Sequence, residues 1–193
     1  SKSEITFFCD AVFSSQEKSL LIGENLKFEN PRNIPRSPEQ LFLDRLGGTI
    51  RMAEILTEVR SKKDLWENIY QYVIQNHGDE KVKPKLGISV FGAGKDFLGN
   101  FLGDLKKYFT THNQEIRFEN SQGKNLTSGQ IFDRKLLKRG EEFIIWKNED
   151  SFLLARTVAN QNLRNYTLRD RAKPFRDAKM GMLPPKLAQI MIN

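Results

Sequence analysis

The spacing of apolar residues predicts a first α+β unit over residues 1–80. In chain order, its expected elements are a strand at 5–13, a short helix at 16–26, two strands within 41–59 joined at Gly47-Gly48, and a helix at 64–77. The last helix has the clearest pattern, because Leu65, Ile69 and Val73 recur every four residues on one face. A serine before this helix and a glycine after it suit its two ends.

A charged stretch with a proline at residues 79–84 marks the expected boundary with a second α/β unit over residues 81–163. Its expected elements are a strand at 86–91, a turn at 92–94, a helix within 96–113, a short strand at 115–120, a helix at 128–140, and two strands within 141–161 about a turn at Asn148–Asp150. In the first of these helices, Phe97, Phe101 and Leu105 share one face.

The third region, residues 164–193, is a basic linker that leads into an apolar helix. Prolines stiffen its path, and Pro185 suits the first position of a helix at 185–193. An isolated helix of this length is marginal in water, so we expect it to be the first element of a further domain. The alternative is a C-terminal tail that docks on its own domain.

The net charge of the chain indicates which class of partner to expect. The net charge is +7 and the isoelectric point is near 9.5, which is in the range of nucleic-acid-binding proteins. No apolar run reaches the length of a membrane span, so we expect no membrane partner. The single cysteine, Cys9, rules out an intrachain disulfide, which favours the reducing cytoplasm.

The candidate catalytic motifs are weak. Gly92–Lys95 is similar to a fragment of a phosphate loop, but the spacing fails and Asp96 follows, so a plain strand-to-helix turn is the better interpretation. No carboxylates are spaced as an acid–base pair, and the two histidines have no metal-ligand spacing. We therefore predict no catalytic residues and no metal.

Basic residues provide the candidate RNA contacts. Those predicted to bind RNA phosphates are Arg169, Arg171, Lys173, Arg176 and Lys179, supported by Lys135, Lys138 and Arg139. Tyr166 and Phe175 are candidates to stack on an exposed base. The alternative for each basic pair on a helix is a solvated face without a ligand.

Four segments resemble one protein family. They are LGGTIRMAEI (46–55), SGQIFDRKLLKRGEEF (128–143), LLARTVANQN (153–162) and RDRAKPFRDAKMGMLPPKLAQIMIN (169–193). Together they are similar to the THUMP-containing tRNA guanosine methyltransferases of the Trm-eleven and archaeal position-10 type, most of all to the bacterial members. The last segment is the most specific part of the resemblance.

The resemblance implies an α+β protein with two small α/β domains, ferredoxin-like (1–80) and then THUMP-like (81–163), and a basic linker that ends in the first helix of a Rossmann-like domain. It also implies tRNA as the partner and S-adenosylmethionine as the cofactor, with Gly181, Leu183 and Pro184 at the lip of the cofactor pocket. The family's glycine-rich Asp-Pro-Phe-Xaa-Gly-Xaa-Gly loop and its Asp-Pro-Pro-Tyr motif do not occur in this sequence. We therefore expect the chain alone to transfer no methyl group.

The sequence thus predicts the tRNA-recognition region of a methyltransferase whose catalytic domain lies outside this chain. Two alternatives stay open at this point. One is the N-terminal region of a DNA-modifying methylase, and the other is a stand-alone adaptor that binds RNA or, through the apolar helix, a protein.

Overall fold

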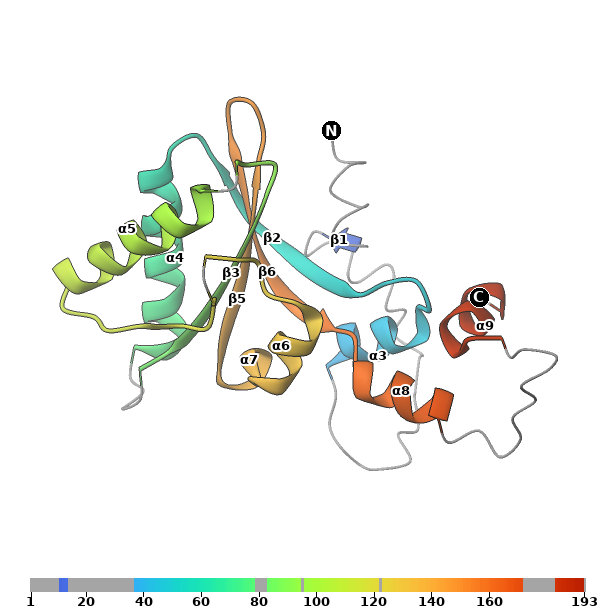
Figure 1. The fold of residues 1–193 in the computed structure, drawn as a ribbon. Coiled ribbons are helices and arrows are strands. Elements are labelled where there is room, and N and C mark those ends of the chain that lie inside the picture. Colours follow the sequence, from blue (N-terminus) through green and yellow to red (C-terminus); the bar gives the residue numbers. More distant parts are fainter. Residues whose placement is uncertain are drawn as a thin grey trace. The chain divides into compact units, whose positions relative to one another are not determined.

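The computed structural model describes residues 37–78, 83–94, 96–121, 123–171 and 183–192, together with the backbone of residues 11–13 (Figure 1). Over this part of the chain the protein is α+β, as predicted, with a mixed sheet. Residues 5–10 of the first predicted strand and the whole predicted helix at 16–26 lie outside the described residues.

Strands and helices are interspersed along the sequence. The strands are β1 (Ala11–Phe13), β2 (Arg51–Val59), β3 (Lys85–Phe91), β4 (Arg117–Phe118), β5 (Gly140–Lys147) and β6 (Phe152–Asn160). The helices are α3 (Pro38–Arg45), α4 (Lys62–His77), α5 (Phe97–Thr111), α6 (Ser128–Asp133), α7 (Leu136–Arg139), α8 (Leu163–Arg171) and α9 (Pro185–Ile192). The helices predicted at 64–77 and 96–113 and the strands predicted at 86–91 and 141–161 are confirmed.

The strands lie in the order β1-β2-β6-β5-β3-β4. β3 pairs in parallel with both β4 and β5, whereas β5 and β6 form an antiparallel hairpin. The parallel register begins with Lys85 opposite Arg117 on one side of β3 and opposite Gly140 on the other. The starts of three strands therefore meet at one end of the sheet, where the basic residues discussed below are found.

The chain divides into two compact units, unit 1 (Ser1–Met52 and Val158–Asn193) and unit 2 (Ala53–Thr157). This division differs from the predicted boundary at residues 79–84, which falls inside unit 2. The reason is that α4 and β3 share one core, in which Leu65 and Ile69 of α4 lie with Leu86 and Ile88 of β3. Likewise, the segment predicted to be a separate linker belongs to unit 1.

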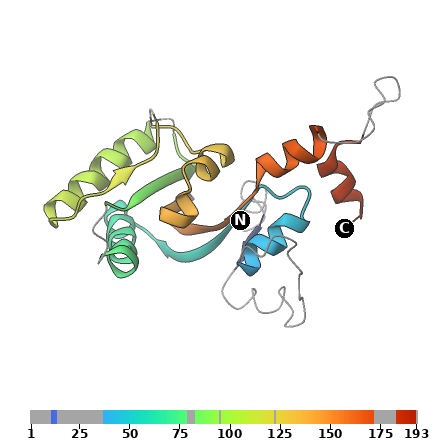
Figure 2. The same ribbon diagram turned by 90° about the horizontal axis from the view of Figure 1, so that it is seen from below.

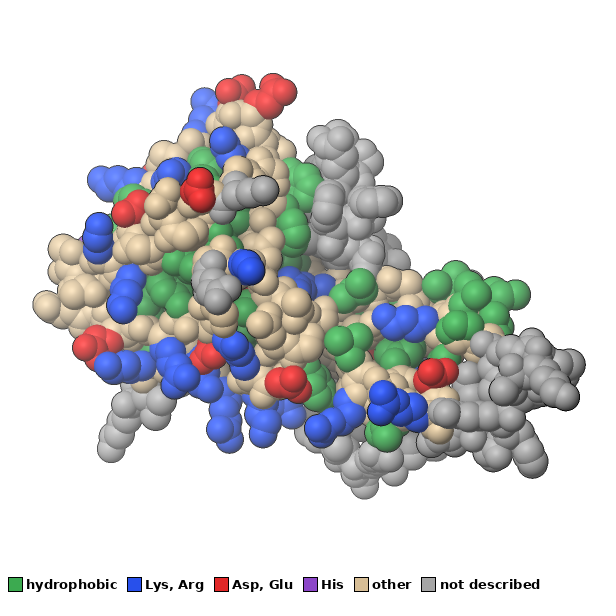
Figure 3. All heavy atoms as spheres, viewed as in Figure 1, with side chains coloured by type: hydrophobic (Ala, Val, Ile, Leu, Met, Phe, Trp, Pro, Cys, Tyr) green, Lys and Arg blue, Asp and Glu red, His purple; other side chains and the backbone are tan. Residues whose placement is uncertain are grey.

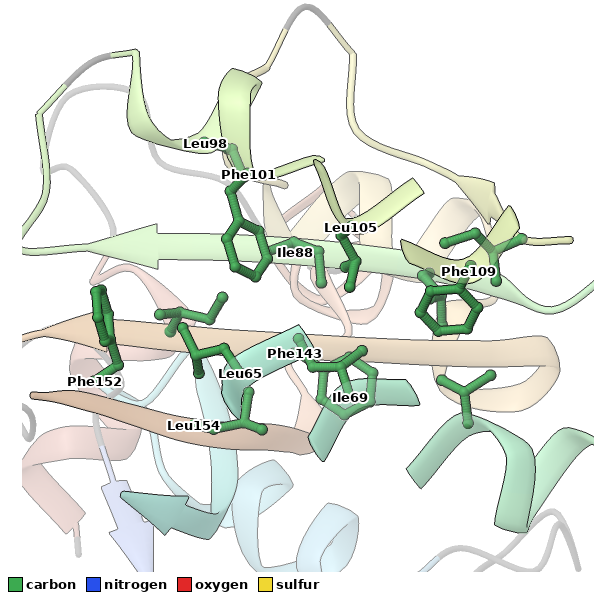
Figure 4. Close-up of a cluster of buried hydrophobic side chains, with 14 residues drawn as sticks. Leu65, Ile69, Ile88, Leu98, Phe101, Leu105, Phe109, Phe143, Phe152 and Leu154 are labelled. Atoms are coloured by element: carbon green, nitrogen blue, oxygen red, sulfur yellow. The ribbon is translucent and has the colours of Figure 1, made fainter. Parts of the chain in front are cut away.

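The core of unit 2 lies between the sheet and the helix pair α4 and α5, which lie side by side in Figures 1 and 2. Figure 4 shows how Leu65 of α4, Phe101 of α5 and Phe143 of β5 point into the same apolar layer. All three are almost fully buried. The four-residue spacing of apolar residues in both helices is thus explained by one shared core.

The opposite face of the same strands carries the two short helices α6 and α7. Leu126, Ile131 and Leu136 form a small apolar cluster there. Gly87 of β3 lies directly beneath this cluster, and a Cβ atom at that position would collide with the Leu126 side chain. The cluster therefore sits close to the sheet only because β3 has no side chain at this point.

Two predicted elements differ from the structure. The first strand predicted within 41–59 is wrong, because α3 is a helix that begins after Ser37, whose Oγ accepts a hydrogen bond of 3.2 Å from the Gln40 amide. A serine cap followed by proline outweighs the short apolar run that predicted a strand. The helix predicted at 128–140 is two helices, because Lys135 adopts a left-handed conformation (φ 55°) between them.

In unit 1, α9 packs on residues of its own unit. The Tyr166 hydroxyl donates to Gln189 Oε1 at 2.9 Å, and Gln189 Nε2 donates to the Asp44 carbonyl at 2.8 Å. A Cβ atom at Gly47 would lie 2.5 Å from the Lys186 carbonyl oxygen, so the absence of a side chain permits this approach. Within the described residues α9 therefore has partners in unit 1, as in the docked-tail alternative, and its assignment as the first element of a further domain stays a prediction.

Candidate nucleic-acid interface

Unit 2 has an open cleft of about 610 Å³ with mainly basic walls. It is lined by Lys85, Arg117, Phe118, Glu119, Asn120, Ser121, Asp133, Arg134, Lys135 and Arg139. Five of these residues are Lys or Arg and two are acidic, which gives the lining a formal charge of +3. In Figure 3, Lys and Arg side chains gather along the lower edge of unit 2, where Figure 1 shows α6 and α7.

Two elements of the sheet supply one wall of the cleft. Lys85 is the first residue of β3 and Arg117 is the first of β4, and the parallel register places them opposite each other. Neither residue was predicted from the sequence, because Lys85 directly follows the charged stretch interpreted as a boundary and Arg117 is the one cation of its short predicted strand. Only the pairing of the two strands brings their charges together.

The α6–α7 corner supplies the other wall. α6 begins with a capping box, in which Thr127 Oγ1 accepts from the Gln130 amide and Gln130 Oε1 accepts from the Thr127 amide. After the left-handed turn at Lys135, the fully buried Leu136 anchors α7 against the sheet. Lys135 and Arg139, four residues apart, both line the cleft.

A loop held by two asparagine side chains forms the floor. Where β4 ends, Asn120 takes over its pairing with β3, accepting from the Ile88 amide at 2.9 Å and donating to the Ile88 carbonyl at 2.7 Å. Asn125 makes the same pair of bonds to Val90, both at 2.8 Å. The side chains thus replace a strand along the edge of β3 and fix the loop that carries Glu119 to Ser121.

The predicted RNA-binding residues fall into three groups. Lys135 and Arg139 line the cleft, and Lys138 is exposed on the same short helix. Arg169 and Arg171 are exposed on α8 in unit 1, where the Arg169 guanidinium lies 5.0 Å from the centre of the Tyr166 ring. The remaining predicted RNA contacts, Lys173, Arg176 and Lys179, lie outside the described residues.

Tyr166 does not suit the predicted role of stacking on a base. Its exposed fraction is only 8%. The Arg169 guanidinium and the Lys186 ammonium, which lies 5.2 Å from the ring centre, both pack over its ring. It is a packing residue between α8 and α9. The other stacking candidate, Phe175, lies outside the described residues.

A second polar cluster in unit 2 has a structural role. Arg156 lies 3.3 Å from Glu54 Oε2 and 3.7 Å from Glu141 Oε2, and His77 Nε2 lies 3.2 Å from Glu141 Oε1. Burial by itself lowers the pKa of Arg156, but nearby Tyr72 and the two carboxylates outweigh it and raise the pKa. These contacts join β6 to β2, β5 and α4.

No group of three or more His, Cys, Asp or Glu side chains among the described residues is placed to hold a metal ion. Of the residues predicted near S-adenosylmethionine, Leu183 and Pro184 are exposed just before α9, and their role at a cofactor stays a prediction. Gly181 lies outside the described residues.

Within the described residues, no helix has both the length and the hydropathy that a membrane crossing needs.

Comparisons with known proteins give no family. No protein-family model matches this sequence, and neither does any curated protein. The basic cleft and the four sequence segments are therefore the features of this chain that indicate a function.

Proposed function

We propose that this chain binds RNA by holding phosphates of the RNA backbone in the cleft of unit 2. The observation that carries the proposal is the convergence of Lys85, Arg117, Arg134, Lys135 and Arg139 from two strands and a helix corner on one open cleft. Lys and Arg neutralise phosphates and release counterions, which makes binding favourable and dependent on salt. Among the described residues that line the cleft, Phe118 is the only aromatic one, so contacts to the backbone outweigh contacts to bases.

We further propose tRNA as the RNA, with the chain as the recognition region of a cytoplasmic S-adenosylmethionine-dependent tRNA guanosine N-methyltransferase. The support for this step is the resemblance of residues 46–55, 128–143, 153–162 and 169–193 to that family. S-adenosylmethionine would supply the methyl group in another domain. The role of this chain is to bind and orient the RNA, and the chain itself contributes no catalytic group.

The test is a binding titration of the full chain against a labelled tRNA transcript and a DNA duplex of similar length, at several salt concentrations. If three to five phosphates are held, the logarithm of the association constant falls with the logarithm of salt with a slope of about −2 to −4. Absence of tRNA binding at low salt contradicts the proposal. Equal affinity for the duplex favours the DNA-modifying alternative.

A matched pair of variants locates the interface. Changing Arg117, Lys135 and Arg139 to Gln removes three cleft charges, and we expect an affinity loss of roughly a hundredfold with a slope shallower by about 2 to 3. The control changes Lys63, Lys106 and Lys107 to Gln, which removes three exposed charges from α4 and α5. Equal losses in the two variants would mean that overall charge, and not the cleft, drives binding.

The adaptor alternative has one observation in its favour. α9 leaves apolar side chains in solvent, with Met191 71% and Ile192 84% exposed. Large exposed apolar residues on one helix are typical of surfaces that bind another protein. Light scattering of the chain with and without tRNA separates the two cases, because the adaptor predicts association that RNA does not change.

A further inference from the structure

At the floor of the cleft lies a carboxylate that three cations surround. Glu119 has an exposed fraction of 6%. Its Oε1 lies 3.3 Å from Arg117 Nε and 3.9 Å from Lys85 Nζ, and its Oε2 lies 3.2 Å from Arg134 Nη1. Arg134 also donates to the Glu119 backbone carbonyl. A buried carboxylate is costly unless cations or hydrogen bonds compensate it, and here cations do so.

The position of this carboxylate is fixed by the backbone. The Glu119 amide donates to the Leu86 carbonyl at 2.9 Å, which continues the pairing of β4 with β3. The next residue, Asn120, bonds both backbone groups of Ile88. Glu119 is therefore a rigid point on the sheet, while the cations around it have long and flexible side chains.

We propose that Glu119 is a positioning residue of the RNA-binding cleft, which orients Arg117 and Arg134 toward phosphate. Each guanidinium has five N–H donors in a planar fork. Arg117 faces Glu119 Oε1 through Nε, in an ion pair at 3.3 Å that is not a hydrogen bond, so its two terminal amino groups can still bind an anion. Ordering the arginines before RNA arrives reduces the entropy lost on binding. This inference rests on the proposed RNA-binding function.

For the removal of Glu119, the proposal predicts the opposite change in RNA affinity from the one that net charge alone predicts. A carboxylate among cations lowers the positive potential, so its removal by charge alone strengthens phosphate binding. If Glu119 positions the arginines, its removal weakens binding although the net charge rises by one. The direction of the change in affinity therefore separates the two explanations.

The experiment compares Glu119→Gln with Glu67→Gln in the full chain, using the labelled tRNA transcript as the probe. Glu67 is exposed on α4, so its replacement adds the same charge away from the cleft. We expect Glu119→Gln to weaken tRNA binding by about tenfold, which corresponds to one charge-assisted hydrogen bond, with a shallower salt slope. Glu67→Gln should leave binding unchanged or slightly stronger.

Further measurements keep the outcome clear. Thermal melting confirms that each variant is folded, and Glu119→Asp, which keeps the charge but is shorter, should restore part of the lost affinity. If Glu119→Gln does not fold, the comparison of Glu119→Asp with wild type decides, because positioning still predicts weaker binding at equal charge. Equal or tighter binding by the folded Glu119 variants overturns the inference alone. A wild-type chain that binds no tRNA overturns the proposed function, and this inference with it.

Discussion

The two faces of the sheet in unit 2 differ sharply in chemistry although the same strands form both. On the face that packs against α4 and α5, neighbouring strands contribute Ile88, Phe143 and Leu154, all fully buried and apolar. On the other face, buried Glu142 accepts hydrogen bonds from Ser89 Oγ at 2.8 Å and from Thr157 Oγ1 at 2.6 Å. One face is an apolar core, and the other combines these buried hydrogen bonds with the small apolar cluster under α6 and α7, beside the basic cleft.

This difference indicates that the two faces of the sheet have different roles within unit 2. Burial of large apolar side chains supplies most of the stability of a fold of this size. Polar groups on the second face hold loops and short helices in place, and this fixes the positions of the cleft residues. We therefore expect variants on the apolar face to change stability most, and variants on the second face to change stability less and binding more.

The largest expected effect is on the apolar face. Phe143→Ala removes a fully buried ring and leaves a cavity, so we expect the free energy of unfolding of unit 2 to fall by about 3–5 kcal/mol. Urea denaturation followed by circular dichroism measures this change. The tRNA affinity of the fraction that stays folded should equal that of wild type, and a large loss of affinity would mean that the two faces are coupled.

The buried polar layer should come next. Glu142→Leu leaves the Ser89 and Thr157 hydroxyl groups without their acceptor, and we expect a loss of about 1–3 kcal/mol. The triple variant with Ser89→Ala and Thr157→Val removes the unsatisfied groups as well, so most of the stability should return. A triple variant as unstable as the single one would show that Glu142 acts through other contacts.

A smaller and local effect is expected at the edge of β3. Asn120→Ala removes both bonds to Ile88 and should cost about 1–2 kcal/mol, whereas Asn125→Ala should cost less because water reaches that more exposed position. Amide hydrogen exchange checks this directly, since Ile88 N–H should exchange faster in the first variant and Val90 N–H in the second. Because Asn120 borders the cleft, only its variant should also weaken tRNA binding.

The smallest expected effect is that of a polar pair in full solvent. A hydrogen bond from Lys83, aided by its charge, lowers the pKa of Glu115 from its ordinary value. This pair stabilises the fold fully at pH values above the ordinary pKa of glutamate, and its contribution is lost as pH falls through the lowered pKa. Because both side chains are exposed, Glu115→Gln should change the melting temperature by about one degree or less at any pH. A larger change would mean that the pair contributes more to stability than exposed ion pairs usually do.

The sequence predicted the apolar face better than the cleft. In α4, β3 and α5 the period of the apolar residues agrees with the secondary structure, and a single core satisfies all of them. At the cleft, Lys135 and Arg139 were identified because they belong to basic pairs on a predicted helix. Lys85 and Arg117 were not, because no local pattern shows that the two cations lie opposite each other at the starts of paired strands.

What the sequence by itself determined is the α+β class, most element types, the excess of positive charge and the absence of a motif for nucleotide hydrolysis. These are local properties, since periodicity, caps and charge are set within a few residues. Only the tertiary structure decided that α4 and β3 share a unit, that α9 docks beside α8, and that five cations line one cleft, three of them around Glu119. These properties depend on strand order and register, which join residues far apart in the chain and leave no signal in any one segment.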